Sequence, residues 1–242
     1  MKLDAATVML QWASGGMLFL WFTLRSGEIS VGYGKLLRGV YAGIALIGVA
    51  LGFAFDHVPV REAAGVGLAV VALAAFTRRD TMLDRVATAI GFVGVIFASL
   101  ASDHPDDLLW LVRLLVGAVF LGAVSDAMLL GHWYLVQPGM PRKLLNQLTN
   151  LLLVVWPIEV AVFLLPTGMV SVLNGSIDDG WNGVLGWFWL ACAALTGVLA
   201  WFTRAALRER SYFAVMAATG LSYLAILMGF GTDLVARALL MA

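Results

Sequence analysis

The sequence predicts an all-α integral membrane protein, a bundle of about eight transmembrane helices with short loops. Of the 242 residues, 62% are hydrophobic and only 12% are charged, whereas about a quarter of the residues in a soluble domain are charged. The apolar residues recur in blocks of about twenty, the length of a helix that crosses a hydrocarbon core of about 30 Å. No long polar stretch separates the blocks, so we expect residues 1–242 to form a single transmembrane helical domain.

Eight segments fit a membrane span, and they cover most of the chain. They are 6–24, 36–55, 60–77, 83–101, 108–136, 144–166, 182–203 and 211–236. The first resembles a signal peptide, but it contains Gln11 and Trp12 and no small-residue cleavage site follows Arg25. The third is the weakest, because its uninterrupted apolar core covers only residues 63–76.

The distribution of basic residues predicts the orientation, because lysine and arginine accumulate in cytoplasmic loops. With eight spans and the amino terminus outside, the inner loops receive eleven basic residues: Arg25, Lys35, Arg38, Arg78, Arg79, Arg85, Arg142, Lys143, Arg204, Arg208 and Arg210. The outer segments receive three, Lys2, Arg61 and Arg237. Omitting the third span would invert every later loop. We therefore expect both termini on the extracytoplasmic side, and a prokaryotic plasma membrane as the location.

The span 36–55 carries two G-x-x-x-G spacings, Gly39 to Gly43 and Gly48 to Gly52. Such spacings let a neighbouring helix backbone approach closely. The pattern indicates either packing within the chain or a dimer interface.

Most of the polar side chains at membrane depth fall in the spans 108–136 and 144–166, which a short connector joins. His132 and Gln147 each lie about 6 Å from the inner end of their span. We predict a ligand or proton site, open to the cytoplasm, whose lining is Ser125, Asp126, His132, Gln147 and Asn150. Histidine titrates near neutral pH, so such a site can pass protons or hydrogen-bond a quinone-type carbonyl. The alternative is that these side chains only bond each other across the helices.

A second polar pair, Arg113 and Glu159, has matching depths near the outer ends of the same two spans. An intramembrane ion pair would compensate two charges that are costly alone. Pro157 stands beside Glu159 and removes the hydrogen bond to the Leu153 carbonyl. The pair has either a structural role or a role in transport.

The sequence predicts no catalytic, metal or cofactor site that this chain forms by itself. Cys192 is the only cysteine, so an internal disulfide and a cysteine metal site are excluded. His132 is the only histidine at depth, so we expect no haem held by two histidines of this chain, and no histidine cluster suggests a metal. Phosphate loops, dinucleotide turns and nucleophile elbows are missing from the sequence. We expect no cofactor bound by this chain alone, with quinone a candidate ligand and lipid a certain neighbour.

Two function classes remain. In the first, the protein is a non-catalytic subunit of a larger membrane complex, for example in electron transport, which anchors other membrane or peripheral subunits and lines a quinone-type or proton site. In the second, it is a small-solute or proton-coupled transporter with Asp126 and Glu159 as carriers. Transporters often contain broken helices in matching halves, and only Pro157 interrupts a span here. This favours the subunit, with the transporter as the alternative. No nucleic-acid partner is expected.

Overall fold

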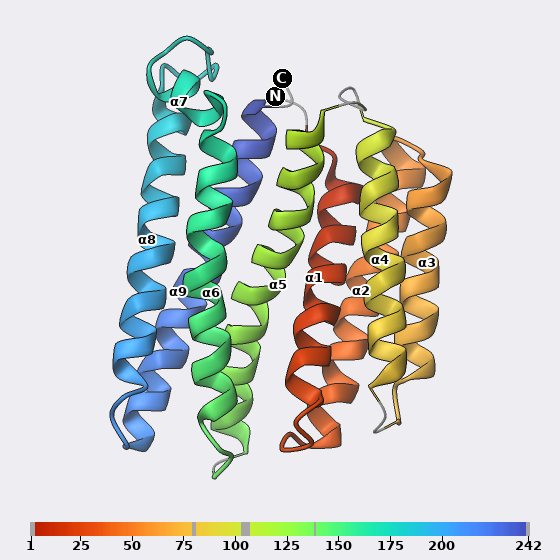
Figure 1. Cartoon of the computed structure of the whole chain (residues 1–242), viewed down its shortest axis with the longest axis vertical. Coiled ribbons are helices and arrows are strands. Elements are labelled where there is room, and N and C mark those ends of the chain that lie inside the picture. Colours follow the sequence, from red (N-terminus) through yellow and green to blue (C-terminus); the bar gives the residue numbers. More distant parts are fainter. Residues whose placement is uncertain (1–2, 79–80, 103–106, 138, 241–242) are drawn as a thin grey trace. The chain divides into compact units, whose positions relative to one another are not determined.

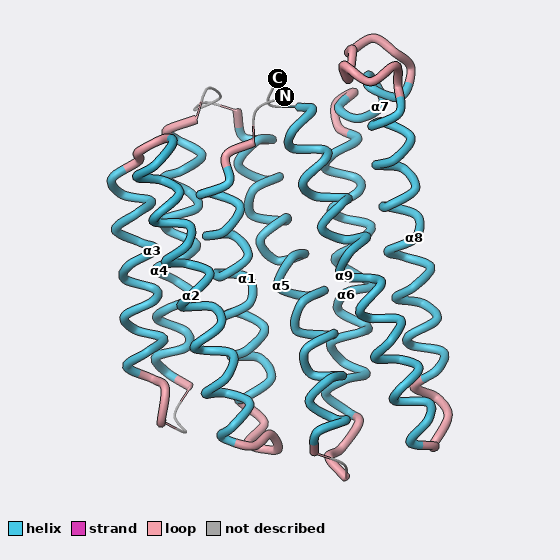
Figure 2. The backbone as a smooth tube through the Cα atoms, turned by 180° about the vertical axis from the view of Figure 1, so that it is seen from behind, coloured by secondary structure: helices cyan, strands magenta, loops and turns pink. Residues whose placement is uncertain are grey.

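The computed structural model describes residues 3–78, 81–102, 107–137 and 139–240, and every regular element within them is a helix (Figures 1 and 2). The helices are α1 (Ala5–Leu24), α2 (Val31–Phe55), α3 (Pro59–Ala74), α4 (Met82–Leu100), α5 (Leu108–Val136), α6 (Lys143–Leu164), α7 (Gly168–Leu173), α8 (Val184–Ala206) and α9 (Tyr212–Leu240). All but α7 coincide with a predicted span. Helix α2 begins five residues earlier than predicted, and α9 extends four residues further.

Seven of these helices are long and apolar enough to cross a membrane, which is consistent with the predicted helical integral membrane protein. The count of eight spans and the sides of the two termini stay predictions. The two helices that fall short among the described residues are α7, with 6 residues, and α3, with 16. At 1.5 Å per residue α3 is about 24 Å long, less than the hydrocarbon core of about 30 Å. Pro59 occupies the first turn of α3, where its missing N–H has no helical partner to lose.

Large apolar side chains project outward from the long helices. The most exposed, each more than 60% accessible, are Phe53, Phe55, Leu108, Val136, Trp187, Phe213 and Leu227. Backbone groups in lipid must find their hydrogen bonds within the segment, which explains why such apolar stretches are helical. The exposed apolar side chains are suited to contact with a lipid bilayer.

The chain divides into two compact units. The first unit is Asp4–Asp126 and the second is Ala127–Ala242 with Met1–Leu3, so α5 contributes to both. In the first unit α1 packs against α2 and α4, and α3 packs against the same two helices. Figure 1 shows that successive helices of this ring run in opposite directions. The single domain expected from the sequence stays a prediction.

The second unit is built around α8 and α9, which pack along each other, with α6 against both. A core cluster sits where α7 meets these helices. Its buried residues are Phe163, Met169, Val172, Trp189, Ala236 and Leu239. The short helix α7 therefore covers one end of α6, α8 and α9, as Figure 1 also shows.

The two glycine pairs of α2 differ in their surroundings. A Cβ atom at Gly48 would lie 2.9 Å from the Met9 Cβ, and one at Gly52 would lie 2.0 Å from Glu62 Oε1, both within the first unit. A Cβ atom at Gly43 would meet nothing within 4 Å. The second pair thus serves packing within the chain.

Candidate functional site

Two glycines bring the backbones of α1 and α5 into direct contact in the first unit. A Cβ atom at Gly15 would lie 1.7 Å from the Ala118 carbonyl oxygen, and one at Gly122 would lie 2.2 Å from the Gly15 carbonyl carbon. Only glycine permits this separation. The contact fixes the part of α5 that follows Gly122, one turn before Asp126.

Asp126 receives a hydrogen bond from α2 across this contact region. The Tyr41 hydroxyl donates to Asp126 Oδ2 at 2.5 Å, and both side chains are fully buried. Tyr33 of the same helix is a second buried neighbour of the carboxyl. Gly16 makes room for the Tyr41 ring, because a Cβ atom there would lie 2.1 Å from Tyr41 Cε1. The site thus depends on three helices, with α1 providing space and α2 providing hydroxyl groups.

The depths of the two bonded residues agree. Asp126 precedes the end of α5 by ten residues and Tyr41 follows the start of α2 by ten residues, which places each about 15 Å along its helix. Next to Asp126, the buried Ser125 hydroxyl accepts a hydrogen bond from Trp12 Nε1 at 2.8 Å. On the same side of α1, Gln11 donates from its amide to the Leu114 carbonyl. Ser125 is therefore bonded to α1, and Asp126 to α2.

In the part of the chain that the structure describes, the Asp126 carboxyl forms no ion pair. It accepts its hydrogen bond from the uncharged Tyr41 hydroxyl. Asp84 provides the contrast within the same unit. Arg38 binds both of its carboxylate oxygens, Nε to Oδ1 at 2.8 Å and Nη2 to Oδ2 at 2.7 Å. Arg38 also donates to the carbonyls of Ala75 and Arg78 at the end of α3. Asp84 and Arg38 thus compensate each other, whereas Asp126 remains available for a proton or cation.

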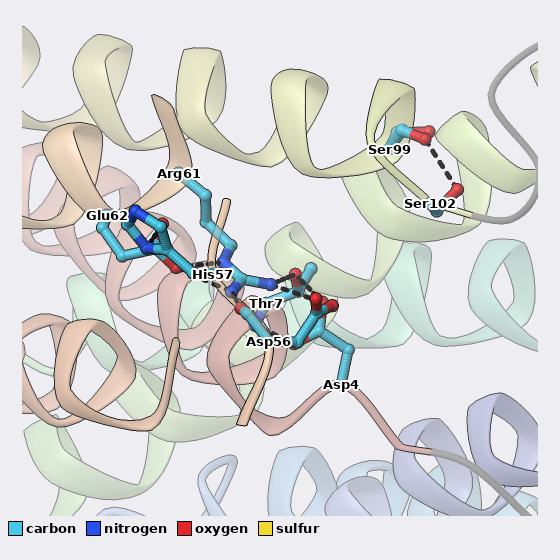
Figure 3. A network of polar contacts seen from close by, with 8 residues as sticks. All are labelled: Asp4, Thr7, Asp56, His57, Arg61, Glu62, Ser99 and Ser102. Atoms are coloured by element: carbon cyan, nitrogen blue, oxygen red, sulfur yellow. Dashed lines mark hydrogen bonds and ion pairs between the residues drawn. The ribbon is translucent and has the colours of Figure 1, made fainter. Parts of the chain in front are cut away.

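Two further carboxylates of the first unit, those of Asp4 and Glu62, share the guanidinium of Arg61, as Figure 3 shows. Arg61 donates to Asp4 Oδ2 at 2.7 Å and to Glu62 Oε1 at 2.7 Å, and the Asp56 carbonyl accepts from the same guanidinium. His57, which is half exposed, lies 3.3 Å from Glu62 Oε2. This cluster joins the start of α1 to the start of α3, so we regard it as structural.

The predicted five-residue site involves both units. Ser125 and Asp126 are buried in the first unit, while His132, Gln147 and Asn150 belong to the second. His132 is exposed, and its Nδ1 lies 3.1 Å from the Tyr223 hydroxyl of α9. Gln147 is partly buried and Asn150 is exposed. The lining by all five residues together therefore stays a prediction.

The predicted ion pair also combines residues of both units. Arg113, 7% exposed, lies in the first unit and Glu159, fully buried, in the second, so their pairing stays a prediction. Within the second unit the neighbours of Glu159 are Asp233 and Arg237 of α9.

Several residues of these sites escaped the sequence reasoning. Tyr41 and Tyr33 were missed because a tyrosine in an apolar helix carries no charge to mark it. Asp233 was missed because it lies near the end of its span, although its spacing of four from Arg237 is the signal of a helical ion pair.

The loop before α8 contains a further ordered carboxylate. The Asp179 oxygens accept hydrogen bonds from the backbone N–H groups of Trp181, Gly183 and Leu185, each at 2.8 Å, and of Gly186 at 3.4 Å. Desolvation raises the pKa of Asp179, but these hydrogen bonds, with that of Gly183 foremost, lower it more, so the net pKa lies below its usual value. Asp179 thus satisfies the free N–H groups at the start of α8.

The chemistry open to these sites is acid–base or cation binding by carboxyl groups. In the described residues no group of three or more His, Cys, Asp or Glu side chains is placed to hold a metal ion. Comparison of the chain with protein-family models, curated proteins and solved structures found no match.

Proposed function

We propose that the protein is a proton-coupled carrier of a small solute, in which Asp126 binds the coupling proton. The observation that carries this proposal is the fully buried Asp126 carboxyl, which accepts a hydrogen bond from the Tyr41 hydroxyl at 2.5 Å. A lone carboxylate inside a membrane bundle costs several kcal/mol. A proton, or a cationic group arriving with the solute, removes that cost.

The surroundings of Asp126 suit reversible proton binding. A tyrosine hydroxyl donates to the carboxylate and accepts from the protonated acid, so it serves both states of Asp126. An arginine partner, as Asp84 has, would instead hold the charged form throughout. Asp126 is therefore a better candidate for a carrier than any of the paired carboxylates of the first unit.

We further propose eight membrane spans with both termini on the extracytoplasmic side of a prokaryotic plasma membrane. The excess of basic residues in the loops on one side supports this orientation. The eighth span is α3, which is short but packs between α2 and α4. Its basic Arg61 is neutralised within the Asp4 and Glu62 cluster, so its presence near the outer surface costs little.

The experiment is solute uptake by vesicles that contain the purified protein and a trapped pH dye. Small solutes are added as separate panels of amino acids, sugars, carboxylates and amines, with an imposed pH gradient. We expect one class to cause proton movement that Asp126→Asn abolishes and Tyr41→Phe lowers. Glu28→Gln, which changes an exposed loop carboxylate, is the matched control and should retain wild-type uptake. Proton-linked uptake that survives Asp126→Asn would refute the proposal.

A second candidate is the dependent subunit of an electron-transport complex with a quinone-type site. The pairing of exposed His132 with Tyr223 favours it, because both side chains can hydrogen-bond a carbonyl at the surface of the second unit. Extraction in a mild detergent followed by mass spectrometry separates the two functions. A stoichiometric partner, together with quinone-linked activity that His132→Ala weakens, would favour the subunit. The absence of such a partner, together with solute-driven proton movement, would favour the carrier.

A further inference from the structure

The second unit contains a buried carboxyl pair that the proposed carrier mechanism does not use. Glu159 on α6 and Asp233 on α9 are both fully buried. They precede the ends of their helices by five and seven residues, which corresponds to about 8 and 11 Å. Asp233 and Arg237 of α9 are the charged neighbours of Glu159 in this unit. The next turns of α6 and α9 meet in the core cluster around Phe163 and Ala236.

One guanidinium serves this pair, and it is directed to only one of the two carboxylates. Arg237 Nε donates to Asp233 Oδ2 at 2.8 Å, and Arg237 Nη2 donates to Asp233 Oδ1 at 2.7 Å. Both Glu159 oxygens are buried with no donor among the described residues. Two carboxylates cannot hydrogen-bond each other unless one of them carries a proton. The charge count gives the same result, because two carboxylates exceed one guanidinium.

In the part of the second unit that the structure describes, the other helices bring no second cation to Glu159. Helix α7 contains no titratable residue. From α8, the titratable Cys192 contacts Gly231, where a Cβ atom would lie 2.7 Å from its sulfur. The basic residues of α6 and its N-cap, Lys143 and Arg142, stand at the opposite end of that helix. Among the described residues of the second unit, Asp233 and Arg237 are therefore the charged groups beside Glu159.

We propose that Glu159 and Asp233 form a proton-binding site, in which Glu159 carries one proton and donates it to Asp233 while Arg237 neutralises Asp233. Binding forms the O–H bond on Glu159, and release leaves a carboxylate beside Asp233. This inference is independent of the proposed carrier function, because Asp126 lies in the other unit. A membrane protein of any activity can hold a proton here.

Pro157 gives the site a means of responding to protonation. It removes one hydrogen bond of α6 a half turn before Glu159, at the Leu153 carbonyl. A helix weakened at this point yields more readily when a like-charge repulsion appears between α6 and α9. We expect loss of the proton to loosen the contact of these two helices.

The test is infrared spectroscopy of the purified full-length protein, which detects the carbonyl stretch of a protonated carboxylic acid. All variants carry Asp126→Asn, so that Asp126 cannot contribute. We expect a protonated-acid band at neutral pH that Glu159→Gln removes. Asp233→Asn should also remove it, because Glu159 then becomes the counter-ion of Arg237. Asp178→Asn, an exposed carboxylate of the outer loop, is the control and should leave the band unchanged.

Thermal unfolding of the same variants keeps the test decisive. Glutamine resembles a protonated glutamate, so adding Glu159→Gln should leave the unfolding temperature close to that of the Asp126→Asn protein, while adding Asp233→Asn should lower it well below that value. The proposal of a shared proton would be overturned if the Asp126→Asn protein showed no protonated-acid band, or if the band survived the addition of Glu159→Gln. Equal losses of stability in the two variants would also overturn it, because they would indicate that Glu159 is ionised and paired with Arg237. None of these outcomes depends on transport.

Discussion

The contact of Gly15 with Gly122 supports the strongest prediction of this structure. In Gly122→Ala the new Cβ atom would lie 2.2 Å from the Gly15 carbonyl carbon and 2.3 Å from its oxygen. Both are backbone atoms, so no side chain can turn away. An ordinary contact begins at 3.4 Å, and reaching it requires α1 and α5 to separate by about 1.2 Å.

A separation of this size affects the site and the stability together. The hydrogen bond of 2.8 Å between Trp12 and Ser125 would stretch beyond bonding range. Overpacking of a closed core costs about 1–3 kcal/mol, which corresponds to about 2–4 °C in Tm for each kcal/mol in a chain of this length. Because Asp126 follows Gly122 by one turn, we also expect lower uptake by Gly122→Ala.

The assay is thermal unfolding of the purified protein in detergent, with Gly43→Ala as the matched control. The same substitution at Gly43 meets nothing within 4 Å. Since alanine favours a helix over glycine by about 0.5–1 kcal/mol, this control should be as stable as the wild type or slightly more stable. The reasoning is refuted if Gly122→Ala and Gly43→Ala unfold at the same temperature.

Two further predictions concern charged groups that the structure shows to be paired. Asp84→Asn leaves the buried Arg38 without its carboxylate, so we expect a loss of about 3–5 kcal/mol in unfolding free energy. Denaturant titration measures this loss, and a value below about 1 kcal/mol would contradict the pairing. Because the folded-state pKa of Asp179 is depressed, its contribution to stability is complete above the unfolded pKa of about 4 and disappears as the pH falls through the folded-state value. The Tm difference between wild type and Asp179→Asn should accordingly be constant near neutral pH and shrink in acid, whereas Asp178→Asn should show little difference; a Tm difference independent of pH would contradict this.

The polar residues show where sequence reasoning stops. The sequence shows which of them lie at membrane depth, because a charged or amide side chain stands out in an apolar block and is costly there. Their partners are not readable, since each partner comes from another helix. Asp126 is joined to Tyr41, which lies 85 positions earlier in the sequence. Glu159 has Asp233 for a neighbour, which the sequence reasoning did not single out.

The sequence by itself determined that the chain is helical, with apolar blocks suited to a membrane, and approximately where its long helices lie. The physical reason is local: a backbone surrounded by hydrocarbon has to satisfy its own hydrogen bonds, so apolar blocks of sufficient length form helices whatever surrounds them. The tertiary structure decided which buried carboxyl group receives a guanidinium and which does not. That choice depends on close approaches such as the one at Gly122, which depend on how side chains from distant segments fit together.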